Sequence, residues 1–319
     1  MNRPLAFITG ITGFAGSWLA EELLDNNYRV AGSVYPGEST EHIDHIRDRL
    51  TLSRLDLLKP DRVASLIKKI SPDYLFHLAA FSSVGQSFSK ERLTFRVNLE
   101  GTLNILMAAR ESGKMRKIIY VSSSDCYGRF SPKNKTLTED QPLNPVSPYG
   151  VSKAATEQLC RMYVNRYDLP ISIARSFNHS GPRQSDNFVI PSFARQIVSI
   201  ENGKQKPVML VGNLSVKRDL SDVRDIVRGY RLIAEKGRPG RVYQLCSGRA
   251  VAISSVLEQF LRLSTVKIKV KTDKARLRKN DIPVMRGDNG RATTELGFSV
   301  RYRLKTTLDD TLNYWRMRS

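Results

Sequence analysis

The fold is decided by a glycine-rich turn near the start of the chain, which reads Thr9-Gly10-Ile11-Thr12-Gly13-Phe14-Ala15-Gly16. The apolar run Leu5–Thr9 before it is typical of a strand buried on both faces of a parallel sheet. A helical pattern follows, with Leu19 and Leu23 on one side. Glycines spaced three apart, between a strand and a helix, permit a tight turn and a close approach to a pyrophosphate, whose charge the helix N-terminus offsets. The turn therefore predicts a dinucleotide site with contacts from Gly10, Thr12, Gly13, Phe14, Ala15 and Gly16.

Strand-like and helix-like segments alternate after this turn. Strand-like runs recur at 28–34, 52–57, 74–77, 117–122 and 171–175. Helix-like stretches lie between most of them, at 61–70, 93–112 and 149–167. This alternation is typical of an α/β fold, so we expect a Rossmann-type doubly wound parallel sheet.

The pattern changes after about residue 178. We expect residues 1–177 to form a Rossmann domain that binds NAD or NADP, with 207–240 returning to it. Residues 178–206 and 241–319 are more irregular, and we expect them to form a smaller, mixed α/β C-terminal lobe that binds the substrate.

Composition narrows the class of protein. The chain has 319 residues, of which 40% are hydrophobic and 26% charged, as in ordinary globular proteins. The net charge is +20, but Lys and Arg are spread along the chain without a polybasic tail, so we expect no nucleic-acid partner. No apolar run approaches the roughly 18 residues of a membrane span, so we expect no membrane association.

The cysteines and the N-terminus indicate the compartment. Cys126, Cys160 and Cys246 are isolated in sequence, without metal-type pairing or a disulfide framework. The N-terminus has no signal-peptide layout. We therefore expect no metal and a reducing, cytoplasmic location.

Two further strand ends suggest cofactor contacts. Asp56, followed by Leu57, could accept a hydrogen bond from an adenine amino group, although a plain strand-end cap is the alternative. The small side chains in Leu78-Ala79-Ala80 leave space for a cofactor, although tight packing would also explain them. At residues 32–35, neither an acid for the ribose 2′-hydroxyl nor an arginine for a 2′-phosphate is present. The cofactor is therefore NADP(H) or NAD(H), with a slight preference for NADP(H) or dual use.

A tyrosine and a lysine four residues apart form the candidate catalytic pair. Tyr149 and Lys153 share one face of a helix. The unperturbed pKa of tyrosine is about 10, and we expect the neighbouring ammonium to lower it toward the working range. Ser123, which ends the preceding strand, could hydrogen-bond the same substrate oxygen. An isolated pair of this kind would be a solvated helix face, but here it follows a strand that ends in serines.

In order and approximate spacing, these motifs resemble the extended short-chain dehydrogenase/reductase family along essentially the whole chain. The resemblance implies a Rossmann domain with a bound nicotinamide. It also implies that Tyr149 transfers the proton and that Lys153 holds the nicotinamide ribose. Relatives commonly pair two helices, so we expect a homodimer through 93–112 and 149–167.

The second half resembles the nucleotide-sugar branch of that family. The stretch 175–184 is similar to the segment whose asparagine, here Asn178, contacts the sugar diphosphate. The stretches 212–219 and 276–283 resemble the group of GDP-mannose dehydratases and GDP-4-keto-6-deoxymannose reductases. That resemblance assigns Arg218 and Arg278 to the nucleotide and its phosphates, and Asp281 to the ribose. Lys279 stands where the group usually has proline, so the local turn can differ.

One position bears on the choice between dehydratase and reductase. A 4,6-dehydratase needs an extra base, and the related dehydratases carry glutamate where this chain has Asp125, one methylene shorter. The related reductases also carry an acid there. We therefore expect a reductase acting on the C4 ketone of a GDP-4-keto-6-deoxyhexose, with Asp125 ordering the sugar hydroxyls. We expect the sugar site to be lined by Ser82, Ser83 and Gln86, although a solvated loop is the alternative.

Other functions stay open at this point. A GDP-mannose 4,6-dehydratase and a nucleotide-sugar C4 epimerase are the enzymatic alternatives. A redox-sensing or RNA-associated protein on the same fold is the non-enzymatic one. The presence of both Tyr149 and Lys153 favours an enzyme.

Overall fold

A computed structural model describes residues 3–129, 136–277 and 281–318. Its centre is a seven-stranded sheet in the order β10-β6-β5-β4-β1-β2-β3, and every neighbouring pair in it is parallel. The strands are β1 (Leu5–Thr9), β2 (Arg29–Val34), β3 (Leu50–Arg54), β4 (Tyr74–His77), β5 (Lys117–Ser123), β6 (Ile171–Ser176) and β10 (Val242–Leu245). The predicted Rossmann-type doubly wound sheet is thereby confirmed.

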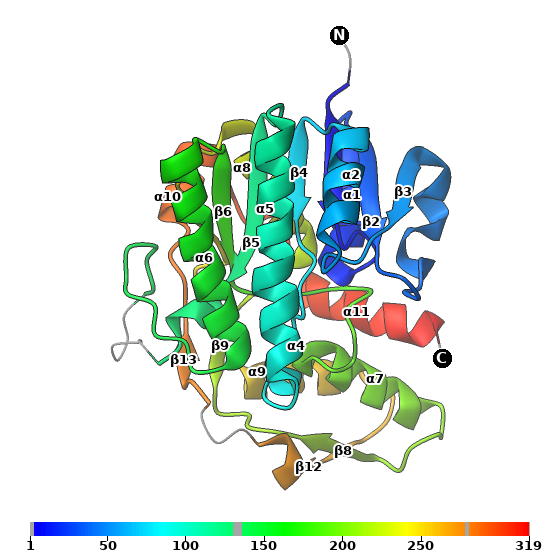
Figure 1. The fold of residues 1–319 in the computed structure, drawn as a ribbon. Coiled ribbons are helices and arrows are strands. Elements are labelled where there is room, and N and C mark those ends of the chain that lie inside the picture. The colour runs from blue at the N-terminus through cyan, green and yellow to red at the C-terminus, as the bar shows by residue number, and fades with distance from the viewer. Residues whose placement is uncertain (1–2, 130–135, 278–280, 319) are drawn as a thin grey trace.

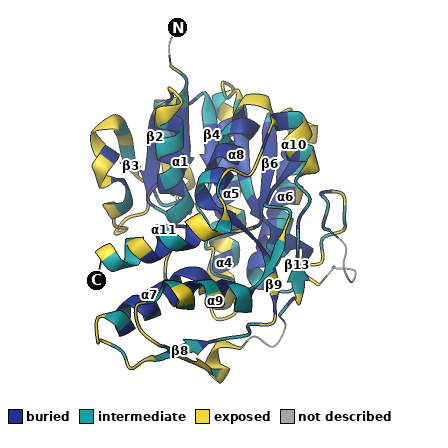
Figure 2. Cartoon of the chain, turned by 180° about the vertical axis from the view of Figure 1, so that it is seen from behind, coloured by how far each residue is buried: buried dark blue, intermediate teal, exposed yellow. Residues whose placement is uncertain are grey.

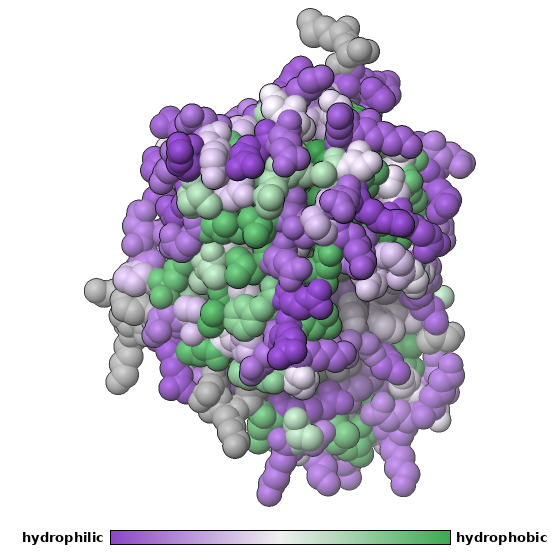
Figure 3. Space-filling model, in the orientation of Figure 1, coloured by the Kyte–Doolittle hydropathy of each residue, from purple (hydrophilic) through white to green (hydrophobic). Residues whose placement is uncertain are grey.

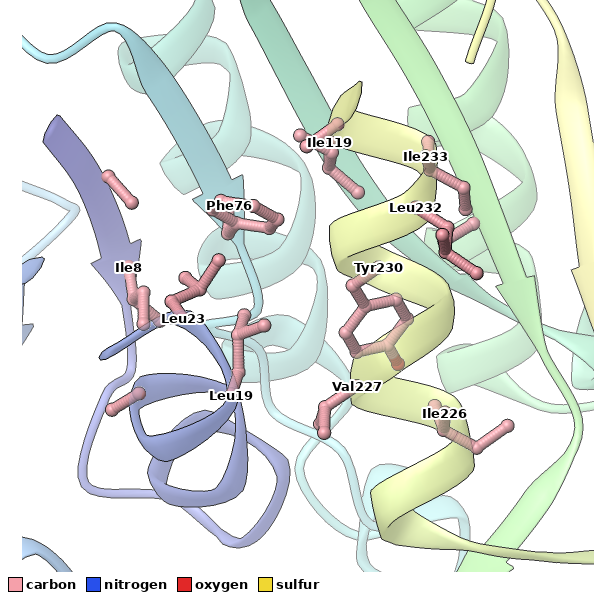
Figure 4. Close-up of a cluster of buried hydrophobic side chains, with 14 of the residues drawn as sticks. Ile8, Leu19, Leu23, Phe76, Ile119, Ile226, Val227, Tyr230, Leu232 and Ile233 are labelled. Carbon is pink, nitrogen blue, oxygen red and sulfur yellow. The ribbon is translucent and has the colours of Figure 1, made fainter. Parts of the chain in front are cut away.

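Helices cover both faces of this sheet (Figure 1). On one face, α1 (Phe14–Asp25) and α8 (Val223–Lys236) pack on the strands, and their apolar sides meet Ile8, Phe76 and Ile119 (Figure 4). The other face is covered by α2 (Pro60–Ile70), α5 (Gly101–Ser112) and α6 (Pro148–Tyr167). Both faces are therefore dry, and Figure 2 shows the central strands as buried.

The order of the strands fixes where a ligand can bind. From β1 the chain proceeds outward through β2 and β3, and it then crosses back to β4 on the other side of β1. Such a reversal opens a crevice at the carboxyl ends of the two strands that flank it. The glycine turn follows β1 and the segment Leu78-Ala79-Ala80 follows β4, so both lie at this crevice.

A smaller lobe lies below the carboxyl ends of the strands in Figure 1. Its core is shared by α7 (Val189–Glu201), α9 (Ile253–Leu263) and α11 (Leu304–Met317), beside the parallel pair β8 (Val208–Val211) and β12 (Lys269–Thr272). A second small sheet joins β7 (Asn178–Ser180), β9 (Lys217–Asp222), β11 (Ala250–Ala252) and β13 (Val284–Met285).

Shorter elements complete the described chain. They are η1 (Glu41–Arg49), α3 (Val84–Ser87), α4 (Glu91–Phe95), η2 (Arg96–Glu100, a π-helical turn), η3 (Ser124–Tyr127), η4 (Lys274–Arg276) and α10 (Gly290–Leu296). The stretch 93–112, expected as one helix, is thus built from α4, η2 and α5. Of the described helices, none is both long enough and apolar enough to cross a membrane.

Two strands belong to a different lobe than the expected domain boundaries predict. β10 belongs to the seven-stranded sheet, where it pairs with β6, although residues 241–319 were assigned to the substrate lobe. β8 pairs with β12 in the small lobe, although 207–240 was expected to return to the Rossmann domain, and within that stretch α8 does so. Short apolar strands carry no mark of the sheet they join, because that depends on partners distant in sequence.

Candidate active site

A cavity of about 2100 Å³ opens at the carboxyl ends of the parallel strands, with walls from both the sheet and the small lobe. The structure brings nearly all of the predicted site residues to this one cavity. Those that line it are Gly10, Gly13, Phe14, Ala15, Gly16, Asp56, Leu57, Leu78, Ala79, Ala80, Ser82, Ser83, Gln86, Ser123, Asp125, Tyr149, Lys153, Asn178, Arg218 and Asp281. Arg278 lies outside the described residues.

The glycine turn is held against the end of β4. Gly10 has a φ of +71°, and a Cβ on it would lie 3.1 Å from the Cα of Ala79. The hydroxyl of Thr9 accepts hydrogen bonds from the backbone N–H groups of Leu78 and Ala79, both at 3.1 Å. Thr9, which the sequence did not single out, therefore ties the two strand ends together.

The start of α1 fits a pyrophosphate. Gly13 caps the helix without a side-chain hydrogen bond, so the first N–H groups are not covered by a capping side chain. A Cβ on Gly16 would lie 2.1 Å from the carbonyl oxygen of Gly10, which only a glycine avoids. The turn and the helix can therefore approach a phosphate closely, as the nicotinamide dinucleotides require.

Thr12 differs from its expected role. Its side chain is buried, it is not among the residues that line the cavity, and its Oγ1 donates a hydrogen bond to Oε2 of Glu38 at 2.8 Å. Glu38 does line the cavity. An acid is therefore present at this end of the site, four residues beyond the end of β2 and outside the stretch 32–35.

The position of Asp56 is compatible with both of its possible roles, a strand-end cap and a contact with adenine. Its Oδ1 accepts a hydrogen bond from the backbone N–H of Leu58 at 2.9 Å, which is a local cap. The residue also lines the cavity, next to Leu57, whose carbonyl accepts a hydrogen bond from Asn104. A contact between Asp56 and an adenine stays a prediction.

The candidate catalytic residues converge at the ends of β5 and α6. Ser147 begins α6 by accepting a hydrogen bond from the N–H of Gly150, and Pro148 takes the first helical position, which presents Tyr149 in the first turn. Ser123 Oγ donates a hydrogen bond to Asp125 Oδ2 at 3.0 Å. One helix turn further, Lys153 Nζ donates to the carbonyl of Val121 at 2.7 Å.

The surroundings of Tyr149 shift its pKa upward. Burial raises the pKa of Tyr149 well above its usual range, and the negative charge of Asp125 raises it further, while a hydrogen bond with Ser123 opposes them. The expectation that Lys153 lowers this pKa stays a prediction, since burial is the largest influence on Tyr149 in the structure. The Lys153 ammonium is turned to a backbone carbonyl, and its own burial lowers its pKa to about 8. Tyr149 therefore carries its phenolic proton in this structure, as a tyrosine of ordinary pKa also does at neutral pH.

A buried ion pair between Arg175 and Glu157 stabilises β5, the strand that ends at Ser123. The side chains of Arg175 and Glu157 are 1% and 0% exposed, and two hydrogen bonds of 2.9 and 2.6 Å join them. Glu157 also accepts a hydrogen bond from Ser122, the neighbour of Ser123. Arg175 further donates to the hydroxyl of Tyr127. This network fixes β5 and β6 relative to α6, and so the spacing of the site.

The far end of the cavity is rich in positive charge. Arg218 Nη1 donates to the carbonyl of Ile282 at 2.7 Å, and its Nη2 lies 3.9 Å from Asp281, so these two predicted contacts are adjacent. Three basic residues that the sequence analysis did not select also line the cavity: Arg195, Lys206 and Arg276. Such a wall suits a diphosphate, because arginine gives paired, charge-assisted hydrogen bonds.

Comparison with known proteins agrees with this arrangement. A family model described as GDP-mannose 4,6 dehydratase matches residues 7–311. The chain is 32% identical to the GDP-6-deoxy-D-mannose reductase of Pseudomonas aeruginosa over 98% of this chain and 97% of that protein. It is 30% identical to the GDP-mannose 4,6-dehydratase of Vibrio cholerae over 82% of this chain and 72% of that enzyme.

Solved structures show the same fold with nicotinamide cofactors bound. A Pseudomonas aeruginosa protein complexed with NADPH matches with a TM-score of 0.87 and 32% identity, over 99% of this chain and 100% of that one. The UDP-glucuronic acid 4-epimerase of Bacillus cereus, in complex with UDP-glucuronic acid and NAD, matches with a TM-score of 0.87 and 27% identity, over 99% and 100% of the two chains. The chain therefore belongs to the GDP-mannose 4,6-dehydratase family, within the extended short-chain dehydrogenases/reductases.

Proposed function

We propose that this protein is an NAD(P)H-dependent reductase of the C4 ketone of a GDP-4-keto-6-deoxyhexose. The observation that carries the proposal is that Tyr149 and Ser123, which share a side-chain hydrogen bond, line the same cavity as Lys153 and the glycine turn. Reduction of a ketone needs a proton donor at the carbonyl oxygen, and the Tyr149 hydroxyl can supply that proton. The 32% sequence identity to the Pseudomonas reductase, over 98% of this chain, supports the same reaction.

Several residues of the chain have separate roles in the reduction at the C4 oxygen. When bound, a reduced nicotinamide supplies the hydride. The Tyr149 hydroxyl donates its proton to the oxygen as negative charge develops there. The Ser123 hydroxyl, which donates to Asp125 in the protein without substrate, turns to donate its hydrogen bond to the same oxygen. Lys153 holds the nicotinamide ribose, and Gly10, Gly13 and Gly16 with the start of α1 hold the pyrophosphate.

The opposite end of the cavity binds the nucleotide part of the substrate. Asn178, Arg218 and Asp281 line this wall, and the family resemblance adds Arg278 to them. Asp125 orders the sugar hydroxyls, because its carboxylate is fixed by Ser123 close to Tyr149. Ser82, Ser83 and Gln86 enclose the sugar from the loop after β4.

A 4,6-dehydratase is the second candidate, because the matching family model carries that description. In that reaction Asp125 would have to act as the base that removes a proton from the sugar. Its side chain is one methylene shorter than the glutamate of the related dehydratases, and this shorter reach toward the sugar proton favours the reductase.

The two reactions are separated by the need for added reductant. The purified protein is incubated with GDP-mannose alone, and separately with a GDP-4-keto-6-deoxymannose supply and NADPH or NADH. We expect oxidation of the reduced cofactor only with the keto sugar, together with a product that is heavier by two hydrogens. Loss of water from GDP-mannose without added reductant would instead establish the dehydratase.

We also propose that the protein is a homodimer. Large apolar side chains are exposed on α5 and α6, and Figure 3 shows apolar surface over these two helices. These residues are Met107, Val151 and Met162. Such a surface is typical of a helix-to-helix interface between copies. The cytoplasmic location stays a prediction, in keeping with three cysteines that are all buried and not in disulfides.

A further inference from the structure

The turn after β2 places a carboxylate at the adenosine end of the cavity. Glu38 N donates to the carbonyl of Tyr35 at 3.0 Å, and Gly37 has a φ of +88°, which closes a tight turn. Glu38 is exposed and lines the cavity. Its Oε2 accepts the 2.8 Å hydrogen bond from Thr12, which is part of the glycine turn itself. The carboxylate is therefore fixed beside the turn that binds the cofactor.

The cavity wall after β2 and β3 carries carboxylates. Among the described residues from Ser33 to Leu58 that line the cavity, those of the acidic or basic types are Glu38 and Asp56. Ser33 lies next to the glycine turn, because its carbonyl accepts a hydrogen bond from Ile11. This stretch follows β2, where the adenosine ribose lies in dinucleotide-binding folds.

The neighbouring arginines are directed elsewhere. Arg183 Nη2 lies 2.7 Å from a carboxylate oxygen of Glu21, and Arg318 pairs with Glu41. Neither these two nor Arg54, at the end of β3, is among the residues that line the cavity. A 2′-phosphate would therefore meet a fixed carboxylate and no cavity-lining guanidinium on the described β2–β3 side.

We propose that Glu38 makes this site selective for NAD(H) over NADP(H), and that Thr12 is the positioning residue that holds its carboxylate. A carboxylate accepts hydrogen bonds from the free 2′-hydroxyl of NAD(H) and repels the 2′-phosphate of NADP(H). The proposal rests on the proposed function, since it concerns the cofactor of that reaction. It also separates this chain from the Pseudomonas protein that was solved with NADPH.

Equilibrium binding tests the proposal without any need for substrate. NADH and NADPH are titrated into the full-length protein at fixed ionic strength, and the nicotinamide fluorescence gives two dissociation constants. The variants are Glu38→Gln, which removes the charge but keeps the size, and Thr12→Val, which removes only the hydroxyl. Asp48→Asn is the matched control, because Asp48 is an exposed acid of the same region that does not line the cavity.

We expect the wild-type protein to bind NADH at least about tenfold more tightly than NADPH. Glu38→Gln is expected to remove most of this preference, mainly through tighter NADPH binding, and Thr12→Val part of it. Asp48→Asn should leave the ratio unchanged. Tighter binding of NADPH by the wild type, or an equal ratio in Glu38→Gln and Asp48→Asn, would overturn the proposal and leave the proposed reductase intact. If neither cofactor binds, both are overturned.

Discussion

Breaking the buried Arg175–Glu157 pair tests how the sheet supports the active site. In Glu157→Gln, the side chain keeps its size but loses the negative charge that faces Arg175, Nη2 to Oε2 at 2.6 Å. Both side chains are at most 1% exposed, so water cannot replace the lost partner. Leaving a buried charge without its counterion costs about 3–5 kcal/mol. We expect the free energy of unfolding to fall by that amount.

The matched control carries the same substitution at the surface. Glu100 pairs with Arg96 at 3.3 Å, but the two side chains are 46% and 54% exposed. Exposed pairs contribute about 0–1 kcal/mol, so Glu100→Gln should change the free energy of unfolding by less than 1 kcal/mol.

Urea unfolding followed by circular dichroism, at equal protein concentrations, measures the difference between the two variants. Thermal unfolding should show a melting temperature roughly 6–20 °C lower for Glu157→Gln, at about 2–4 °C per kcal/mol. Similar free energies of unfolding for Glu157→Gln and Glu100→Gln would refute the reasoning. That result would mean that other partners of Arg175, among them the Tyr127 hydroxyl, compensate its charge.

Three other predictions concern the site and the assembly. Tyr149→Phe should lower kcat by about 10²–10⁴-fold with little change in NADH affinity, because it removes only the proton donor. Steady-state kinetics and a titration with NADH measure the two quantities, and an unchanged kcat would exclude Tyr149 as the donor. Since burial lowers the pKa of Lys153 to about 8, the ammonium loses its charge as pH rises through that value. The affinity of the free protein for NADH should therefore weaken above about pH 8, and Lys153→Met should abolish this pH dependence; an identical profile in the variant would contradict the assignment. Met107→Glu combined with Met162→Glu should convert a dimer into a monomer in light scattering, whereas Met317→Glu, at an exposed site on α11, should not; a wild-type monomer would contradict the proposed interface.

The sequence predicted most of the residues at the glycine-turn end of the cavity because its signals are local. Within the turn, Gly10 adopts a positive φ and a Cβ on Gly16 would meet the Gly10 carbonyl, so both glycines are needed for reasons that act within seven residues. The strand and the helix beside the turn show their own periodicities. The same holds for Tyr149 and Lys153, which one helix turn brings to the same face. These residues therefore came to the predicted place in the structure.

The features of the site that the sequence did not reveal depend on neighbours distant in sequence. The sequence alone assigned no role to Glu38, because a turn and not the strand places it at the cavity. Thr12, from another segment, holds it there. The pKa of Tyr149 depends on how deeply it is buried and on Asp125, neither of which the Tyr–Lys spacing reveals. Arg276 lines the cavity through the fold of the small lobe.

The central claim is that the protein delivers hydride to C4 of a GDP-4-keto-6-deoxyhexose, and isotope transfer tests it most directly. The keto sugar is incubated with the protein and NADH or NADPH deuterated at the transferable position of the nicotinamide, and the product is examined by mass spectrometry and NMR. The account predicts one deuterium per product molecule, located at C4, and its loss in Tyr149→Phe. Conversion of GDP-mannose to the keto sugar without added reductant, and with no deuterium gained from the added cofactor, would contradict it.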